Sequence, residues 1–240
     1  HQTAVIAELT QRGVDKFVFA AMATREVEAP ALANTQRGVL LNCSDSESEW
    51  PVIVPDDRAA AAVAVNHLIA AGHGPRIWLV GEALATGPYA GSVRREGVVQ
   101  TLSVHGCVLA HHVASHWWPP QTREAFAAEL ADTDPADWPT AVIAMNDRTA
   151  MGVYQAAQAA GLVIPRDLSV ISFDNSEVAW WLDPGLTSME LPYQEMGRLA
   201  VEEVLREPGT PHVVSVRLRL HERDSIMAPS PPSPAHVVDS

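Results

Sequence analysis

The sequence predicts an α/β fold built on a mostly parallel sheet. Short apolar runs alternate with stretches of helical periodicity along the 240 residues, as where "TAVIAM" is followed directly by "RTAMGVYQAAQAAG". Strands that alternate with helices form βαβ units, which place the strands parallel to one another. Apolar residues make up 47% of the chain and charged residues 19%, a composition typical of globular proteins.

Strands are expected where short apolar runs lie between turn residues. The run "PVIVPDD" ends in two carboxylates, either of which can cap a following helix. The final run, "VVSVRLRL", has the alternating pattern of one strand with a single buried face. The expected strands cover residues 15–20, 38–42, 51–55, 76–81, 107–113, 140–145, 167–173 and 213–220.

Helices are expected between these strands. One begins at Asp56 or Asp57 and ends near Gly72, and another places Met196, Leu199, Ala200 and Val204 on one face. The first residues have the pattern of the second half of an amphipathic helix, and residues 174–190 have no regular pattern. The other expected helices cover 92–106, 122–132, 148–161 and 191–207, and the Pro/Ser-rich tail 228–240 is expected to be disordered.

Charge and composition exclude several classes of protein. Sixteen basic against 29 acidic residues give a net charge of −13, which repels phosphate backbones and argues against direct nucleic-acid binding by these residues. No apolar run reaches the ~18 residues that span a membrane, and no export signal opens the chain. Cys43 and Cys107 are expected to be reduced thiols in a cytoplasmic protein, with a single disulfide as the alternative.

Short polar side chains follow three of the predicted strands. Asn42, Asn146 and Asp174 each stand at the carboxyl end of a strand, and a parallel sheet brings such ends to a common rim, where ligands bind. Amide and carboxylate groups can hold a sugar hydroxyl, which both donates and accepts hydrogen bonds. Arg94 or Arg95 would add a fork of donors. These residues predict a site for a sugar or a related polar molecule.

Aromatic side chains near the same loops could cover the apolar face of a sugar. The candidates are Tyr89, Trp117, Trp118, Trp180 and Trp181. Each Trp pair could instead belong to the core or to an interface.

Each polar candidate also has a structural explanation. Asp147 is expected to be a helix N-cap, Asn146 could satisfy loop backbone, Asp174 could form a turn, and Arg94 could be a solvated charge. Four histidines between His105 and His116 lie on a strand and loop, where their spacing predicts no metal site. No nucleophile with its base and no phosphate-binding or dinucleotide-binding motif is present, so no catalytic residue, metal or cofactor is expected.

Several segments together resemble the lactose-repressor/galactose-repressor family of bacterial transcription regulators. The seam "NDRTAMG", the strand "GLVIPRDLSVISFD", the turn "DPGLTS" and the helix "YQEMGRLA" carry the resemblance. It extends back through "RREG" and "VNHLIAAGH" to "GVDKFVF" and forward to "ERDS", so that only the tail lies outside it.

The resemblance implies a two-lobed, periplasmic-binding-protein-like (type I) fold with a small effector between the lobes. The chain would cross between lobes three times. The N-terminal lobe would comprise residues 1–57 and 192–217, and the C-terminal lobe residues 58–191 and 218–227. Relatives begin with a DNA-binding headpiece, which these residues do not contain, and the N-terminal lobe would be incomplete.

The resemblance also implies roles for individual residues. The effector-contacting Asn, Asp and Arg of the family fall on Asn146, Asp174 and Arg94, with Arg94 followed by Gly97. Asn42 stands where relatives often carry Asp, and an aromatic plate falls on Trp117 or Trp118. Leu191 stands near a position that is often Gln in the family, which departs from the contact set of galactoside-binding relatives.

We therefore expect an effector-sensing domain of a cytoplasmic regulator. It would form a homodimer, bind a sugar and act on operator DNA through a headpiece outside this chain, without a membrane partner. The alternative is a periplasmic or secreted sugar-binding protein of a transport system. A third hypothesis, a sugar hydrolase using Asp147 and Asp174 as paired carboxylates, fits the sequence less well.

Overall fold

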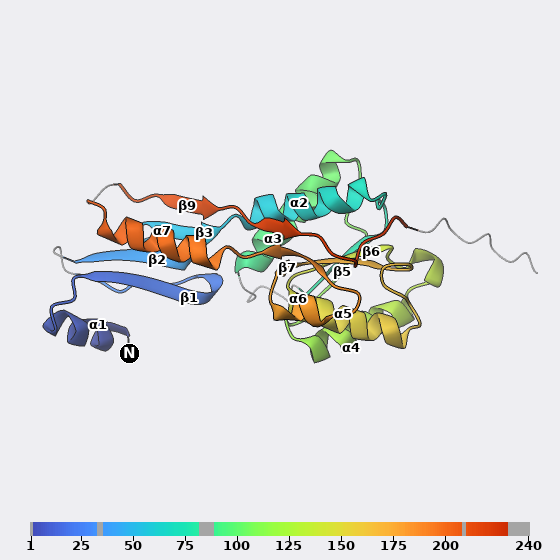
Figure 1. Ribbon diagram of the computed structural model, residues 1–240, viewed down its shortest axis with the longest axis horizontal. Helices are drawn as coiled ribbons and strands as arrows, with labels where there is room; N and C mark the ends of the chain where they lie inside the picture. The colour runs from blue at the N-terminus through green and yellow to red at the C-terminus, as the bar shows by residue number, and fades with distance from the viewer. Residues whose placement is uncertain (1, 33–35, 82–88, 208–209, 230–240) are drawn as a thin grey trace, which may run out of the picture.

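The computed structural model describes residues 2–32, 36–81, 89–207 and 210–229. It contains a four-stranded sheet and a six-stranded sheet, which lie next to each other along the longest axis of the molecule (Figure 1). All strand pairs but one are parallel. The α/β class with parallel sheets is confirmed.

The four-stranded sheet has the order β1-β2-β3-β9. The helix α7 covers one face, where Met196, Ala200 and Val204 pack on Val39 and Ile53. These helix residues are four apart, as the sequence pattern predicts. The elements of this lobe are α1 (Gln2–Gln11), β1 (Lys16–Glu26), β2 (Arg37–Ser44), β3 (Val52–Pro55), α7 (Tyr193–Leu205) and β9 (Val213–Val216).

The six-stranded sheet has the order β10-β8-β7-β6-β4-β5, with β10 antiparallel to β8. Helices cover both of its faces, α2 and α3 on one and α4, α5 and α6 on the other (Figure 1). Its strands are β4 (Ile77–Val80), β5 (His111–Val113), β6 (Ala141–Ala144), β7 (Ser169–Asp174), β8 (Thr187–Glu190) and β10 (Arg219–His221). Its helices are α2 (Asp57–Ala70), α3 (Tyr89–Val104), α4 (Pro119–Asp132), the 3-10 helix η1 (Pro135–Asp137), α5 (Asp147–Ala159) and α6 (Glu177–Trp181).

The core of this lobe follows the alternation of side chains along each strand. Ile143 faces α2 and α3, whereas its neighbours Val142 and Ala144 face the opposite helices. The residues of the central strands β4 and β6 are buried on both faces, which explains why these strands are continuous apolar runs in the sequence.

Three expectations for individual elements are wrong. The run 213–220 is two strands, β9 and β10, which belong to different sheets. The stretch expected to be irregular contains α6 and β8. The expected strand 107–113 shortens to β5, because the chain leaves the helix α3 through a turn at Gly106.

The chain passes from one sheet to the other three times, each time through one or two residues. Asp56 separates β3 from α2, Leu191 and Pro192 separate β8 from α7, and Arg217 and Leu218 separate β9 from β10. These crossovers agree with lobes of residues 1–57 plus 192–217 and 58–191 plus 218–227, which we keep as proposed boundaries.

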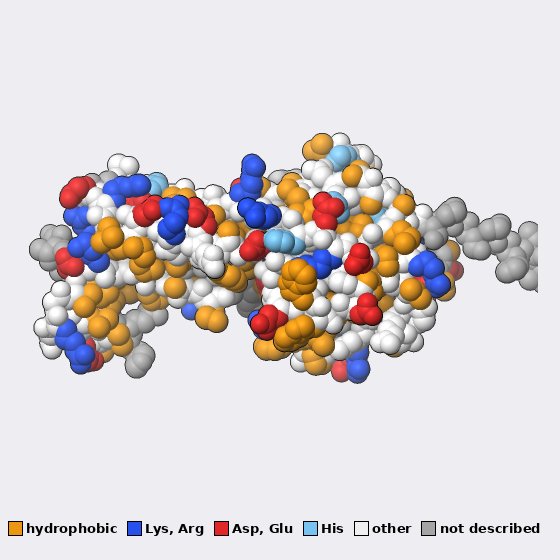
Figure 2. All heavy atoms as spheres, viewed as in Figure 1, with side chains coloured by type: hydrophobic (Ala, Val, Ile, Leu, Met, Phe, Trp, Pro, Cys, Tyr) orange, Lys and Arg blue, Asp and Glu red, His pale blue; other side chains and the backbone are white. Residues whose placement is uncertain are grey.

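Figure 2 shows charged side chains of both signs over α7, where Arg198 bridges Glu195 and Glu202.

Cys43 and Cys107 are free thiols, and burial raises the pKa of Cys43. None of the helices in the described part of the chain is long and apolar enough to span a membrane. Most of the expected disordered tail, residues 230–240, lies outside the described residues.

Candidate functional site

A cavity of about 320 Å³ lies between the two sheets. Six residues that the sequence predicted for the site line it: Asn42, Arg94, Trp117, Trp118, Asn146 and Asp174. Sequence reasoning missed Met22, Thr24, Ala90, Arg148 and Tyr193, and Leu191 completes the lining. Tyr89 begins α3, but its side chain lies outside the described part of the structure.

Arg94 contributes a buried cation to this cavity. Its side chain, on α3, is 2% exposed, and Nε donates a hydrogen bond of 2.7 Å to Oδ1 of Asp57. Nη1 donates to the carbonyl oxygen of Met145 at 2.5 Å, and the guanidinium carbon lies 4.4 Å from the ring centre of Phe173. Arg95 is exposed, so Arg94 is the arginine of the site.

Asn146 ends the loop after β6 and caps the helix α5. Its Oδ1 accepts a hydrogen bond of 2.8 Å from the backbone N–H of Thr149, which satisfies a helix-terminal donor. The side chain is buried, and among the described residues its Nδ2 has no hydrogen-bond partner. The amide nitrogen is therefore available to a ligand.

Asp147 is not the helix cap that the sequence predicted. It is fully buried in the first turn of α5, and its carboxylate accepts hydrogen bonds from Ser172 Oγ, Ser188 Oγ, and both the N–H and Oγ of Ser176. It thereby joins β7 and β8 to the turn that follows Asp174. Both of its oxygens accept hydrogen bonds from this chain, and Asp147 is not among the residues that line the cavity.

Asp174 closes β7 in a strained backbone conformation. Its φ is 106° and that of Asn175 is 49°, values that L-residues rarely adopt. Burial raises the pKa of the Asp174 carboxyl to about 7, although the guanidinium of Arg94 acts in the opposite direction. Backbone strain and a shifted pKa at a cavity are features that concentrate at functional sites.

Asn42 supplies the opposite wall from the other sheet. Its φ is 56°, its Oδ1 accepts a hydrogen bond of 2.7 Å from Thr24 Oγ1, and its Nδ2 donates one of 3.0 Å to the carbonyl of Ala21. The β1–β2 register breaks here, between Ala20 and Arg25. Such a bulge redirects side chains, and this one accounts for the presence of Met22 and Thr24 in the cavity.

The two tryptophans of the cavity differ in exposure. Trp117 is partly buried, and its Nε1 is buried without a hydrogen-bond partner among the described residues. Trp118 is 57% exposed, and the guanidinium carbon of Arg148 lies 5.0 Å from its ring centre. Trp180 and Trp181 do not line the cavity, and Trp180 instead packs on Arg223 at 4.0 Å.

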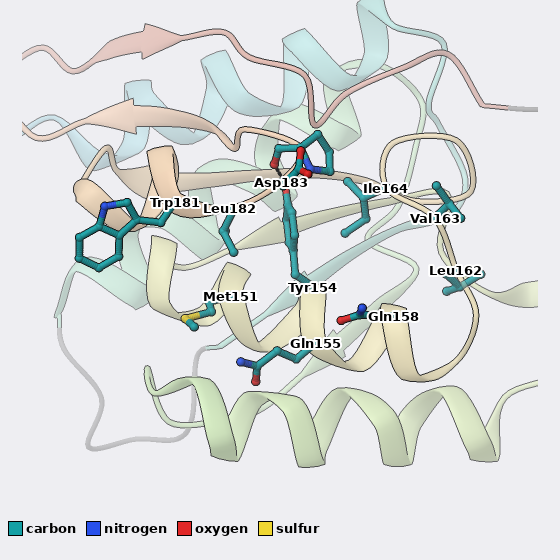
Figure 3. Close-up of a pocket in the computed structure, with 11 residues that line it drawn as sticks. Met151, Tyr154, Gln155, Gln158, Leu162, Val163, Ile164, Trp181, Leu182 and Asp183 are labelled. Carbon is teal, nitrogen blue, oxygen red and sulfur yellow. Dashed lines mark hydrogen bonds between the residues drawn. The ribbon is translucent and has the colours of Figure 1, made fainter.

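A second cavity, of about 370 Å³, lies between α5 and α6 (Figure 3). Tyr154 donates a hydrogen bond of 3.1 Å across it to the carbonyl of Pro184, and burial raises the pKa of Tyr154. Its polar side chains Gln158 and Asp183 are exposed, whereas Asn42, Arg94 and Asn146 of the first cavity are buried. Buried polar groups that converge in a cavity mark the first cavity as the candidate site.

Comparisons with known proteins agree with this architecture. The family model of the periplasmic binding protein-like domain matches residues 65–226. The HTH-type transcriptional regulator MalR of Streptomyces coelicolor is 33% identical over 218 residues, covering 84% of this chain and 61% of MalR. The sucrose operon repressor of Escherichia coli is 32% identical over 206 residues, covering 81% of this chain and 60% of the repressor. The chain thus spans about three fifths of the length of these relatives.

Solved structures of LacI-family proteins are also similar to this chain. A LacI-family protein from Rhizobium etli matches with a TM-score of 0.82 and 27% identity, covering 94% of this chain and 83% of that chain. A LacI-family regulator from Enterococcus faecium, solved with bound ribose, has a TM-score of 0.73 and 24% identity, covering 95% and 85%, and supports the fold. The chain therefore belongs to the periplasmic binding protein-like domain family, and its predicted resemblance to LacI-type regulators is confirmed.

Proposed function

We propose that this chain is the effector-binding part of a LacI-type transcription regulator. The observation that carries the proposal is a single cavity bounded by both sheets, in which Arg94, Asn146 and Asp174 face Asn42 and Thr24. A sugar or a related polyhydroxylated molecule suits these groups, since each hydroxyl can donate to one and accept from another. The regulator would act in the cytoplasm.

Binding would be converted into a change of lobe arrangement. A ligand that contacts Asn42 on one lobe and Asp174 on the other stabilises the closed arrangement more than the open one. It shifts the equilibrium only by this difference in affinity. In a homodimer the shift would alter the spacing of two DNA-binding headpieces attached to the lobes, and with it the affinity for operator DNA.

The binding site is tested by calorimetry with a panel of sugars. We expect Asp174→Asn to weaken binding about tenfold or more, because a carboxylate that accepts from sugar hydroxyls is replaced by a weaker acceptor. Asn suits the positive φ of this position better than Ala does. Asp137→Asn, in the exposed 3-10 helix η1, is the matched control. Equal affinity of wild type and Asp174→Asn for a bound sugar would disprove the site.

The alternative is a sugar-binding component of a transport system with the same fold. The regulators among the relatives favour the first proposal. The gene sequence upstream of His1 decides between them, since a basic helix-turn-helix and an apolar export signal differ in composition.

A further inference from the structure

The turn after β7 places Asp174 in the wall of the cavity through an unfavourable backbone conformation. Asp174 and Asn175 have φ values of 106° and 49°, which two successive L-residues rarely adopt. A backbone of this kind persists only where the surrounding groups hold it. The groups that hold this turn therefore also fix the position of the Asp174 carboxylate.

Arg223 holds the side chain of Asn175. Its Nη2 donates a hydrogen bond of 2.6 Å to Oδ1 of Asn175, and its Nη1 donates one of 2.5 Å to the carbonyl oxygen of Leu186. The indole of Trp180 covers the guanidinium, whose carbon lies 4.0 Å from the ring centre. A planar guanidinium that is fixed at two nitrogens and at one face holds its acceptor in a single position.

Arg223 lies in the segment that follows the third crossover between the lobes. This crossover, at Arg217 and Leu218, leads directly into β10, and Arg223 comes shortly after the end of that strand. The backbone N–H of Arg223 donates a hydrogen bond of 3.0 Å to Oγ1 of Thr187, which joins the segment to β8. Arg223 thus connects the chain that returns from the other lobe to the turn behind the cavity.

The surroundings of Arg223 argue against a direct contact with a ligand. Arg223 does not line the cavity, and the charges that act on the Asp174 carboxyl belong to Arg94, Asp147, Arg148 and Asp57. Its Nε is buried without a hydrogen-bond partner among the described residues, which is unfavourable for stability. A buried donor left in this state needs an explanation, and a constraint from an adjacent functional site supplies one.

We propose that Arg223 is a positioning residue of the effector site, which acts through Asn175 to hold the Asp174 carboxylate in the cavity wall. The proposal deepens the proposed function and rests on it for the identity of the site. Without the hydrogen bond from Arg223, the turn relaxes and water reaches the Asp174 carboxylate.

The proposal is tested without a ligand by the titration of Asp174. Carbon-13 NMR of carboxyl-labelled Asp in the 240-residue chain follows this titration, and Asp174→Asn assigns the signal. Burial raises the pKa of Asp174 to about 7, and Arg223→Met should lower this pKa by about 1 or more, towards the value of about 3.9 of an exposed Asp. Loss of a nearby positive charge alone would raise the pKa of a carboxyl, so the direction separates a change of position from a change of charge.

A second variant and a control show whether Arg223 acts through Asn175. Asn175→Gly removes the acceptor and allows the φ of 49°, so it should lower the pKa of Asp174 as Arg223→Met does, with no further fall in the double variant. Ser225→Ala is the matched control, because Ser225 lies in the same segment and donates a buried hydrogen bond of 2.6 Å to the carbonyl of Val170. It should lower the free energy of unfolding in urea and leave the pKa of Asp174 unchanged.

The possible results separate this proposal from the proposed function. A pKa of Asp174 that is unchanged or raised in Arg223→Met would overturn the proposal, as would an equal fall in Ser225→Ala or additive falls in the double variant. Where a sugar of the calorimetric panel binds, Arg223→Met should weaken its binding about tenfold, and equal affinity would overturn the proposal. If no sugar of the panel binds, the proposed function fails, whereas the titration still decides whether Arg223 positions Asp174.

Discussion

The Nε atom of Arg94 donates a hydrogen bond of 2.7 Å to Oδ1 of Asp57, and both side chains are almost fully buried. Asp57 is the first residue of α2, directly after a crossover between the lobes, so the pair joins the crossover to the cavity. A buried cation without its counterion is strongly unfavourable.

Asp57→Asn should therefore destabilise the protein by about 3–5 kcal/mol, because it removes the carboxylate that pairs with the buried Arg94 charge. Urea denaturation measures the change. Glu96→Gln is the control, since it breaks the exposed pair between Glu96 and Arg58, with an expected loss of less than about 1 kcal/mol. Similar losses of stability in the two variants would contradict the idea that burial makes the pair of Arg94 and Asp57 more important than an exposed ion pair.

Asp174 makes stability depend on pH. Burial raises its pKa to about 7, above the value of about 3.9 of an exposed Asp. Between these values the folded protein binds more protons here than the unfolded chain does, so this residue lowers the free energy of unfolding as pH rises. Asp174→Asn removes the effect. The Tm of Asp174→Asn, relative to that of the wild type, should therefore be higher at pH 8 than at pH 5. A difference in Tm that does not change with pH would contradict the raised pKa of Asp174.

Asp147 is expected to matter for stability through its hydrogen bonds. Asp147→Ala leaves the donors of Ser172, Ser176 and Ser188 without an acceptor, at about 1–3 kcal/mol for each donor that water does not reach. Chemical denaturation should show a large loss, whereas Asp183→Ala, at an exposed position, should change stability by less than about 0.5 kcal/mol. A small loss for Asp147→Ala would mean that water replaces the carboxylate.

Two helical glycines should respond oppositely to the same substitution. A Cβ on Gly152 of α5 would lie 2.6 Å from Pro119 O and from Thr122 Cβ, so Gly152→Ala pushes α4 away and costs about 1–3 kcal/mol. A Cβ on Gly197 of α7 meets no atom within 4 Å, so Gly197→Ala should stabilise by about 0.5–1 kcal/mol through helix propensity. Thermal unfolding measures the change in stability of each variant, and changes of the same sign in both variants would contradict this packing.

Most of the fold could be predicted from local patterns, but β8 could not. Thr187 and Ser188 are polar, so the strand has no apolar run, although both residues are fully buried. Their hydroxyls are satisfied by distant groups, Ser188 by Asp147 and Thr187 by the backbone N–H of Arg223. Tertiary contacts of this kind leave no signal in the local sequence.

The candidate site was predictable where a strand end supplied the residue. Asn146 and Asp174 follow apolar runs, and Arg94 begins the segment "RREG" that carries part of the family resemblance. Met22 and Thr24 reach the cavity through an irregularity of β1, which no residue type in "AAMATRE" indicates. The sequence predicted Asp147 as the cap of α5, but Asn146 caps it. Both residue types are good caps, and the position at which β6 ends decides which of the two caps the helix.

The three crossovers of one or two residues limit how the two lobes can move relative to each other. Each residue spans at most ~3.6 Å, so three such tethers prevent the lobes from sliding or separating and leave a small pivoting rotation as the main freedom. In the proposed function, ligand binding would therefore reorient an attached headpiece by rotating one lobe against the other. A compound that contacts only one lobe would bind without causing this rotation.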